Sequence, residues 1–324
     1  TSHSFTYMDD YRNVKRIKTE GGKMKRNIIQ RGLARAGYKG YMNWIPDSLY
    51  LKLMFWARLG LKLNYSNPKT LNEKVQLLKL KDRKKEYIKW VDKYSVRQYI
   101  EDKIGRDYLI PLVGGPWNKF EDIDFDKLPD QFVLKCTHDS GGLVICTDKS
   151  TLNFEEAKNK IKKSLNNNYY WSGREWPYKQ VPPQIIAEKY MVDKSGTELK
   201  DYKILCFNGK PDNIMICTGR NSSRGVKYYF FSPDWQFLRY NYGDEDLPED
   251  FTISPPDNLN EMLDIARKLS FGTKLSRIDL YEADGRVWFG EITLYPDSGF
   301  DTDILPSTDL LFGKKLDVSE YLNR

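Results

Sequence analysis

The segment SRIDLYEADGRVWFGEITLYPDSGF, residues 276–300, constrains the fold of this chain more than any other stretch. It contains two strand-like runs separated by Ala283-Asp284-Gly285. Glycine in third place suits a three-residue hairpin loop, in which that position is left-handed. Because such a loop places Arg277 opposite Glu291, the segment predicts an antiparallel hairpin in this register.

Side-chain alternation assigns the residues of this hairpin to two faces. The polar face holds Arg277, Asp279, Glu291 and Thr293. The apolar face holds Ile278, Leu280, Ile292 and Leu294. Since Mg²⁺ takes oxygen ligands, usually one or two carboxylates plus substrate phosphates, the polar face predicts a platform for a metal ion and a nucleotide. Two alternatives stay open: a two-residue Asp284-Gly285 turn, which would put Asp279 and Glu291 on opposite faces, and a half-exposed hairpin with a surface salt bridge.

The positive charge of the chain lies towards one end. Residues 1–120 hold 26 Lys and Arg against 11 Asp and Glu, a net of +15, whereas the remainder holds 26 against 34, a net of −8. We expect the basic part to contact an anionic glycan or a membrane surface, and we expect no nucleic-acid partner. The cations assigned to this contact are Lys79, Lys81, Arg83, Lys84 and Lys85. The alternative is a solvated helical surface that pairs with the acidic part.

Cysteine usage and hydropathy indicate a compartment. Four cysteines, without a CxxC pair, lie in apolar strand-like runs, which predicts buried thiols in a reducing environment. The sequence contains neither an apolar run long enough to cross a bilayer nor a secretory signal. We therefore expect a cytoplasmic protein, with peripheral association at the inner face of the membrane as an option. Residues 1–23 are interpreted as a flexible or expression-derived leader.

Hydrophobic periodicity divides the rest of the 324 residues into three parts. Residues 24–110 form a basic helical region, in which the apolar run 49–59 either packs on a neighbouring domain or lies on a membrane surface. Residues 111–184, opening with a chain reversal at Gly114-Gly115-Pro116, and residues 185–324 form two α+β subdomains with mostly antiparallel sheets. The capping-box pattern of residues 70–73 predicts the start of a helix.

Three further segments carry candidate chemistry. Lys135 precedes the turn Asp139-Ser140-Gly141-Gly142, whose backbone N–H groups can surround phosphate. Glu188 lies in an apolar strand, residues 184–191, whose edge can hydrogen-bond adenine. Lys203 opens a hairpin around Asn208-Gly209 and can reach a nucleotide from the side opposite Lys135. Each segment taken alone also has a purely structural interpretation.

Other polar residues leave alternatives open. With only two histidines in the chain, a His-based zinc site or a Ser-His-Asp triad is hard to assemble. His138 either contacts phosphate or is structural. Arg220 and Arg224 either bind phosphate or a substrate carboxylate, or lie in a solvated loop. The run YYWSGREWPY, residues 169–178, forms either a lid or a packed loop.

In order and spacing, the segments FVLKCTHDSGG, IIAEKYM, DYKILCFNGKP and RIDLYEADGRVWFGEITLYPDSGF resemble the ATP-grasp superfamily. They are most similar to its TupA-like branch, which is linked to teichuronopeptide and other bacterial surface polysaccharide synthesis. The stretch VDKYSVRQYIEDKIG fits as well, and the resemblance runs from about Thr70 to the C-terminus.

This resemblance implies an ATP-grasp fold, in which two α+β subdomains hold ATP between them. Lys135 and Lys203 correspond to the nucleotide lysines, with the turn at residues 139–142 on the phosphates. The adenine hinge corresponds to Glu188, Lys189, Tyr190 and Met191. The Mg²⁺ carboxylates correspond to Asp279 and Glu291, with Thr293 where many relatives carry Asn, which puts a second metal ion in doubt. Arg277 corresponds to a phosphate-contacting arginine, and Arg220 is the other candidate catalytic residue.

The activity that the resemblance implies is an ATP- and Mg²⁺-dependent carboxylate–amine ligase acting through an acyl phosphate. Its carboxylate substrate would be a uronic acid or an amino acid, and its acceptor an amine. The alternatives are a kinase of the same fold acting on a sugar hydroxyl, a glycosyltransferase, and a non-catalytic module that binds polyanions.

Overall fold

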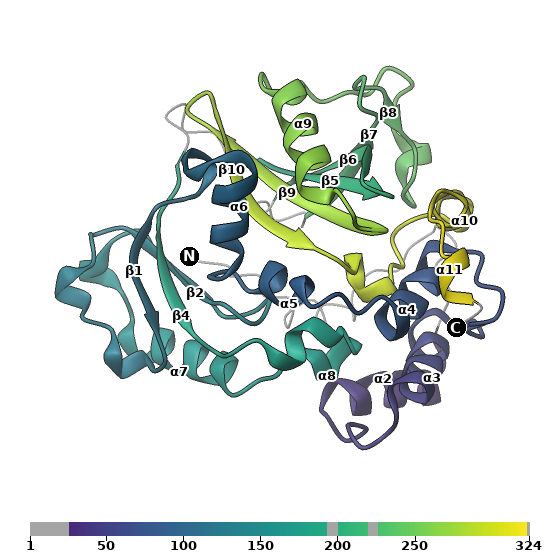
Figure 1. Ribbon diagram of the computed structural model, residues 1–324, viewed down its shortest axis with the longest axis horizontal. Coiled ribbons are helices and arrows are strands. Elements are labelled where there is room, and N and C mark those ends of the chain that lie inside the picture. The colour runs from purple at the N-terminus through teal and green to yellow at the C-terminus, as the bar shows by residue number, and fades with distance from the viewer. Residues whose placement is uncertain (1–25, 193–199, 220–225, 323–324) are drawn as a thin grey trace.

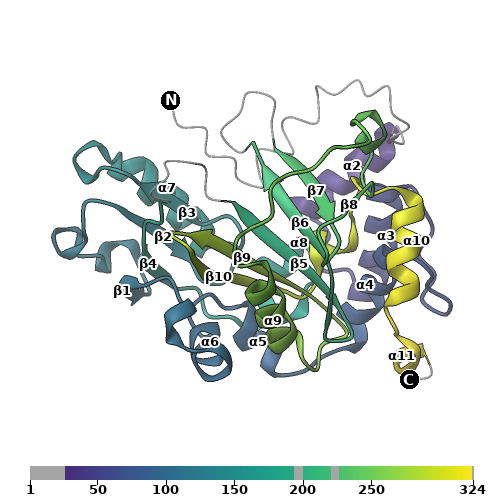
Figure 2. The same cartoon turned by 90° about the horizontal axis from the view of Figure 1, so that it is seen from above.

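The computed structural model describes residues 26–192, 200–219 and 226–322. Within these ranges the chain forms a group of N-terminal helices and two antiparallel sheets, as Figures 1 and 2 show. The order of helices and strands confirms the predicted α+β class, with a helical part ahead of the sheets.

The N-terminal helices are α2 (Ile28–Tyr38), α3 (Asp47–Leu59), α4 (Leu71–Lys81), α5 (Glu86–Val91) and α6 (Val96–Ile104). Helix α4 begins as its sequence predicts, because the Thr70 side chain accepts a hydrogen bond from the Glu73 backbone and the Glu73 carboxylate accepts one from Thr70. Helix α3 buries its apolar side against α2 and Phe300. Of the two interpretations of residues 49–59, the packed helix is therefore the one observed.

A four-stranded sheet follows, with strand order β1-β4-β2-β3. Its strands are β1 (Leu112–Trp117), β2 (Phe132–Cys136), β3 (Leu143–Cys146) and β4 (Ile185–Lys189). Helix α7 (Phe154–Leu165) packs on β2 and β3, and its buried Ile161 joins Phe132 and Leu134 in a separate core.

Two sequence predictions about this sheet are wrong. The boundary at residue 185 assigned β4 to the second subdomain, but β4 lies between β1 and β2, because long-range strand pairing, which local pattern does not encode, decides its sheet. Gly114-Gly115-Pro116 forms no chain reversal. These residues continue β1, where shifts in the pairing with β4 absorb the irregular backbone.

The second sheet has strand order β10-β9-β5-β6-β7-β8. Its strands are β5 (Asp201–Phe207), β6 (Lys210–Thr218), β7 (Lys227–Phe231), β8 (Phe237–Leu238), β9 (Leu275–Ala283) and β10 (Arg286–Thr293). Helix α9 (Leu259–Ser270) covers one face, while α10 (Pro306–Lys315) packs on α4 and ties the end of the chain to the N-terminal helices. The short helices α8 (Tyr170–Gly173) and α11 (Ser319–Leu322) complete the set.

The β9–β10 hairpin has a different turn from the predicted one. Ala283 pairs with Arg286, so the turn is the two-residue Asp284-Gly285, and both of its residues have positive φ, at 55° and 71°. This is the geometry of a type I′ turn. A shift in pairing between Phe289 and Glu291 then adds one residue to β10.

That bulge lies at Gly290 and restores the predicted faces. Asp279 pairs directly with Glu291, and Arg277 pairs with Thr293 instead of with Glu291 as predicted. The polar residues still share one face, although the predicted turn and register are wrong. A Cβ atom at Gly290 would lie 2.9 Å from the backbone oxygen of Asp279, which explains why glycine occupies the bulge.

All four cysteines are buried, as predicted from their apolar surroundings. Across the part of the chain that the structure describes, the helices are too short or too polar to cross a membrane.

Candidate active site

A cleft of about 60 Å³ lies between the two sheets. Lys135 and Glu188 line it from the four-stranded sheet, Phe289 and Glu291 line it from the β9–β10 hairpin, and Arg97 lines it from α6. A larger open groove of about 640 Å³ adjoins it and shares Arg97. The cleft therefore brings together predicted site residues that are more than 150 positions apart in the sequence.

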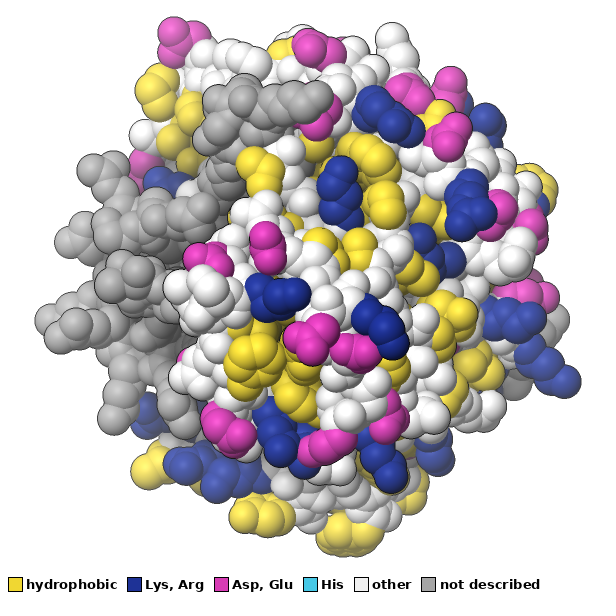
Figure 3. All heavy atoms as spheres, turned by 90° about the vertical axis from the view of Figure 1, so that its left-hand side faces the viewer, with side chains coloured by type: hydrophobic (Ala, Val, Ile, Leu, Met, Phe, Trp, Pro, Cys, Tyr) yellow, Lys and Arg dark blue, Asp and Glu magenta, His cyan; other side chains and the backbone are white. Residues whose placement is uncertain are grey.

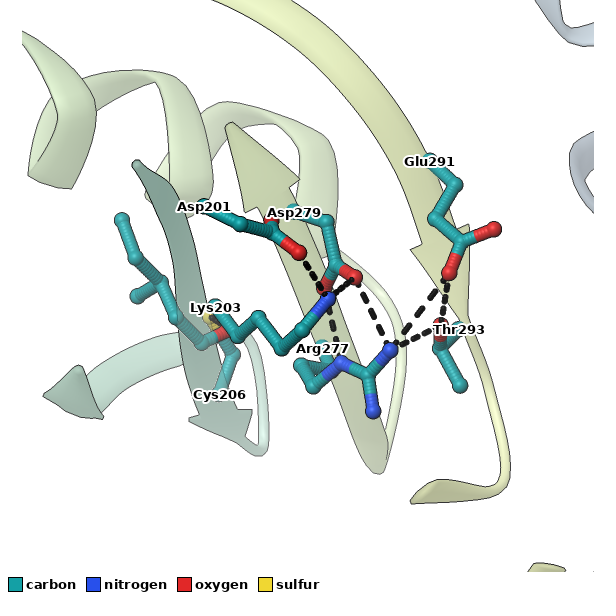
Figure 4. A network of polar contacts seen from close by, with 8 residues as sticks. Asp201, Lys203, Cys206, Arg277, Asp279, Glu291 and Thr293 are labelled. Atoms are coloured by element: carbon teal, nitrogen blue, oxygen red, sulfur yellow. Dashed lines mark hydrogen bonds and ion pairs between the residues drawn. The ribbon is translucent and has the colours of Figure 1, made fainter. Parts of the chain in front are cut away.

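On the hairpin side, Arg277 and Asp279 form a two-pronged ion pair (Figure 4). The Nε and Nη2 atoms of Arg277 lie 2.7 and 2.9 Å from the two carboxylate oxygens of Asp279, whose exposed fraction is only 1%. Burial raises the pKa of Asp279, but Arg277 and Lys203 outweigh that effect and lower the pKa below its ordinary value.

Lys203 reaches the same carboxylate from the neighbouring strand β5, because Lys203 pairs with Asp279 across the sheet. Its Nζ donates to Asp279 and lies 2.6 Å from Asp201. Burial lowers the pKa of Lys203, yet the carboxylates of Asp279 and Asp201 raise it above its ordinary value. Lys203 therefore stays cationic at neutral pH.

Glu291 and Thr293 complete the polar face on β10 and are held more loosely. The Nη2 atom of Arg277 lies 3.4 Å from Glu291 and 3.2 Å from the Thr293 hydroxyl. The Glu291 side chain is 45% exposed, in contrast to Asp279. Glu291 can thus exchange its partners at small cost. Asp279 is held by three donors and can accept a further ligand only through its remaining lone pair.

The oxygen ligands on this face would suit one magnesium ion that takes its other ligands from water and substrate. Two carboxylates and a hydroxyl are the protein ligands expected where Mg²⁺ keeps water and substrate phosphates as its other ligands. The described residues contain no group of three or more His, Cys, Asp or Glu side chains that could hold a metal ion without such help.

On the opposite side of the cleft, Lys135 and Arg97 converge on one carboxylate. The Nζ of Lys135 lies 2.5 Å from Glu188, and Nη1 of Arg97 lies 3.3 Å from it. Arg97 also donates to the backbone oxygen of Ile110. Glu188, which is 7% exposed, is thus a buried counter-ion for two cations in this structure.

The predicted adenine hinge needs a correction at Glu188. The prediction relied on an open strand edge, but β4 is an internal strand whose residues pair with β1 and β2. Two-sided pairing engages the backbone as far as Lys189, whose N–H bonds the oxygen of Pro111. Tyr190 and Met191 lie just beyond the strand and remain the hinge residues to be tested.

The glycine-rich turn divides into a packed part and an open part. Asp139 is buried, accepts a hydrogen bond from the Gly142 backbone, and contacts Ser164 on α7. A Cβ on Gly142 would lie 2.6 Å from Cys136, so this glycine is required by packing. Ser140 is exposed and Gly141 half-buried, with 4.0 Å between a Cβ on Gly141 and its nearest neighbour. Only Ser140 and Gly141 therefore stay positioned for a ligand.

Two other candidates are placed away from ligand contact. His138 is buried, and its Nε2 lies 3.1 Å from the backbone oxygens of Ser164 and Asn167, so it ties the turn to the end of α7. Arg174, from the YYWSGREWPY run, is 1% exposed and packs over Tyr50 and Trp171, which supports the packed loop over the lid. Arg220 and Arg224 lie outside the described residues.

Sequence reasoning missed Lys93 and Arg97, which line the cleft from the helical region. Lys93 also donates to the backbone oxygen of Asp139 and so reaches the glycine-rich turn. Both lie in VDKYSVRQYIEDKIG, which the family resemblance already included, so an available signal was two cations close together in that segment. Lys79, assigned from its charge to a surface contact, is instead fully buried, and its Nζ donates to Gln76, Gly173 and Ser298.

Comparisons with known proteins identify the family. A family model described as TupA-like ATPgrasp matches residues 73–317. Since that match spans well over half of the chain, the protein belongs to the TupA-like ATP-grasp family and has its α+β fold. A search of curated proteins found no match.

Solved structures similar to this chain include three enzymes. The D-alanine–D-alanine ligase from Bacillus anthracis, complexed with ATP, has 17% identity and a TM-score of 0.39, with 72% of this chain and 64% of that chain covered. The L-amino acid ligase from Bacillus licheniformis has 12% identity and a TM-score of 0.38, with 83% and 56% covered. The N5-carboxyaminoimidazole synthase from Aspergillus clavatus has 12% identity and a TM-score of 0.37, with 68% and 54% covered. This chain thus spans less than two thirds of the length of each.

Proposed function

We propose that this TupA-like ATP-grasp protein is an ATP- and Mg²⁺-dependent carboxylate–amine ligase. Family membership supports ATP as co-substrate. The observation that carries the proposal is the polar face of the hairpin, where Arg277, Asp279 and Glu291 line up beside Lys203. Of this face, Glu291 lines the cleft that Lys135 lines from the other sheet.

The cations in and beside the cleft would bind the triphosphate from both sides. Lys135 and Lys93 lie on one side, with Lys203 and Arg277 on the other. Because the cleft encloses only about 60 Å³, against roughly 300–1,000 Å³ for a typical small-molecule site, ATP binding requires the two sheets to part. We expect the Lys135–Glu188 ion pair to open in that step, which frees Glu188 for a hydroxyl or amino group of the nucleotide.

Asp279 and Glu291 would hold the magnesium ion, and Thr293 would lie beside it. A metal ion bound there supplies positive charge next to the transferred phosphoryl group. Asp279 meanwhile holds Arg277 and Lys203 in fixed positions. Fixed cations stabilise the developing negative charge without reorganising during the reaction.

The proposed chemistry has two steps. An oxygen of the substrate carboxylate attacks the γ-phosphorus of ATP, and ADP leaves. The amine nitrogen then attacks the carbonyl carbon of the acyl phosphate, loses a proton and expels inorganic phosphate, so an amide remains. Much of the rate enhancement would come from positioning the three reactants together.

The proposal also names the classes of the two substrates. We propose a uronic-acid-containing glycan or its precursor as the carboxylate, and an amino acid or short peptide as the amine, in bacterial surface polysaccharide synthesis. The resemblance to the TupA-like branch is the support for this assignment, since the described site contains cations suited to carboxylates in general.

Trapping of the acyl phosphate tests the reaction class. Uronic acids and glutamate are incubated with ATP, Mg²⁺ and hydroxylamine, and hydroxamate and phosphate are measured. A ligase forms both, and Glu291→Gln should lower both about a hundredfold or more, while the exposed-site variant Asp264→Asn retains them. Transfer of the γ-phosphoryl group to a sugar, without phosphate release or hydroxamate, would establish the kinase instead.

A further inference from the structure

The segment that leads into α3 is unusually basic. From Gly21 to Pro46 the sequence contains no Asp or Glu. In the described part of this segment the cations are Arg26, Arg31, Arg35 and Lys39. None of these forms an ion pair with a described carboxylate. By contrast, Figure 3 shows basic and acidic side chains interspersed on the side of the molecule that carries the four-stranded sheet.

The geometry of α2 places these cations together with an apolar side chain. Gln30, Ala34 and Gly37 are buried, which fixes the inward side of the helix. Ile28, Arg31, Arg35 and Lys39 follow helical spacing on the outward side. Ile28 is 78% exposed, and its neighbour Ile29 is 62% exposed. We call this outward side, together with Tyr41 and Trp44 in the following turn, the α2 patch.

The turn between α2 and α3 exposes two aromatic side chains to solvent. Trp44 is 82% exposed and Tyr41 is 69% exposed. This turn is firmly anchored, since the buried Arg174 lies 3.1–3.3 Å from the backbone oxygens of Met42, Asn43 and Ile45. The exposure of Trp44 is therefore imposed by a fixed backbone and does not arise from a loose loop.

We propose that the α2 patch docks this protein on an anionic lipid bilayer. Tryptophan and tyrosine favour the boundary between lipid head groups and acyl chains, and isoleucine favours the acyl side of it. Unpaired arginine and lysine beside them attract anionic head groups. A polysaccharide would match the cations but leave Ile28, Ile29 and Trp44 without apolar contacts, so charge and hydrophobicity together select lipid.

Docking by this patch leaves the cleft free. The α2 patch comes from residues 26–46, none of which lines the cleft, whereas the cleft residues begin at Lys93 and the family match begins at residue 73. The inference is thus independent of the proposed ligase activity, and either can fail without the other.

Vesicle binding tests the inference without ATP or substrates. The full chain is sedimented with vesicles of phosphatidylcholine, with and without phosphatidylglycerol, at low and physiological salt. We expect binding only with phosphatidylglycerol. The double variant Arg31→Gln, Arg35→Gln should bind roughly 25-fold more weakly at low salt, because each cation near an anionic surface contributes about a fivefold change. Trp44→Ser should weaken binding at both salt concentrations, because apolar insertion is not screened.

A matched control lies at the end of α9, where Phe271 is 77% exposed beside the exposed Lys268. The double variant Phe271→Ser, Lys268→Gln should bind vesicles like the native chain. Equal binding to neutral and anionic vesicles, or native binding by the patch variants, overturns the inference. A native dimer that Trp44→Ser dissociates would show that the patch binds a second copy of the chain instead. If the native chain binds soluble polyuronate but not vesicles, and the patch variants do not bind polyuronate, the patch binds polysaccharide instead.

Discussion

The polar face of the β9–β10 hairpin and the α2 patch are both rich in cations, but their surroundings differ. On the hairpin, Arg277 and Lys203 share the buried carboxylate of Asp279. On α2, Arg31 and Arg35 are exposed and have no described carboxylate as partner. Burying a charge costs several kcal/mol unless it is paired, whereas an exposed charge keeps its hydration. Burial and pairing thus fix the position of the hairpin cations, whereas the exposed cations of α2 are held by no described carboxylate.

The largest expected effect comes from removing the shared carboxylate. Asp279→Asn leaves the buried Lys203 with Asp201 alone and the buried Arg277 with only its long ion pair to Glu291, so we expect the free energy of unfolding to fall by about 3–5 kcal/mol. Urea denaturation followed by circular dichroism measures it. The control is Asp124→Asn, which breaks an exposed pair with Lys127 and should leave the unfolding curve unchanged. A native-like curve for Asp279→Asn would mean that the hairpin cations are not held by pairing.

The exposed carboxylate of the same face should behave in the opposite way. Glu291→Gln removes charge at the proposed metal site but disturbs only a long contact of 3.4 Å to Arg277. We expect turnover to fall about a hundredfold or more, with a native thermal unfolding temperature. In the α2 patch, Arg35→Gln should change neither quantity. Equal turnover in Glu291→Gln and the native chain would remove Glu291 from the proposed metal site.

A smaller expected effect is the pH dependence of stability that comes from the buried carboxylate of Glu175. Burial raises the pKa of Glu175 to about 7, although the nearby Lys79 opposes this. Between about pH 4.5 and pH 7, Glu175 is therefore protonated in the folded chain but ionised in the unfolded chain, where its pKa has the ordinary value of 4.5. Its stabilising contribution is full below about pH 4.5 and is lost as the pH rises towards 7.

The variant Glu175→Gln should not show this loss. The unfolding free energy of the native chain, measured relative to that of Glu175→Gln, should therefore fall between pH 4.5 and pH 7. Denaturant melts at a series of pH values measure it. Arg31→Gln should follow the native pH dependence throughout. Parallel curves for the native chain and Glu175→Gln would show that Glu175 titrates alike in both states.

The β9–β10 hairpin was predicted in part from the sequence. Alternation correctly placed Asp279 and Glu291 on one face, yet the turn was wrong by one residue and the bulge at Gly290 went unnoticed. A signal for the bulge was present. The apolar alternation Val287, Phe289 continues at Ile292 and Leu294, one residue out of phase. A phase slip across a glycine in a strand indicates a bulge.

The sequence by itself determined the helical N-terminal part, the α4 capping box, the two carboxylates of the hairpin face and the family. These features depend on local spacing and on motifs in a fixed order, both of which are written along the chain. Only the tertiary structure decided that Lys79 is buried, that Glu188 pairs with Lys135 and Arg97, and that Trp44 stands in solvent. The reason is physical: burial and pairing depend on which distant segments pack together, and the same lysine or tryptophan fits a core or a surface until those neighbours are fixed.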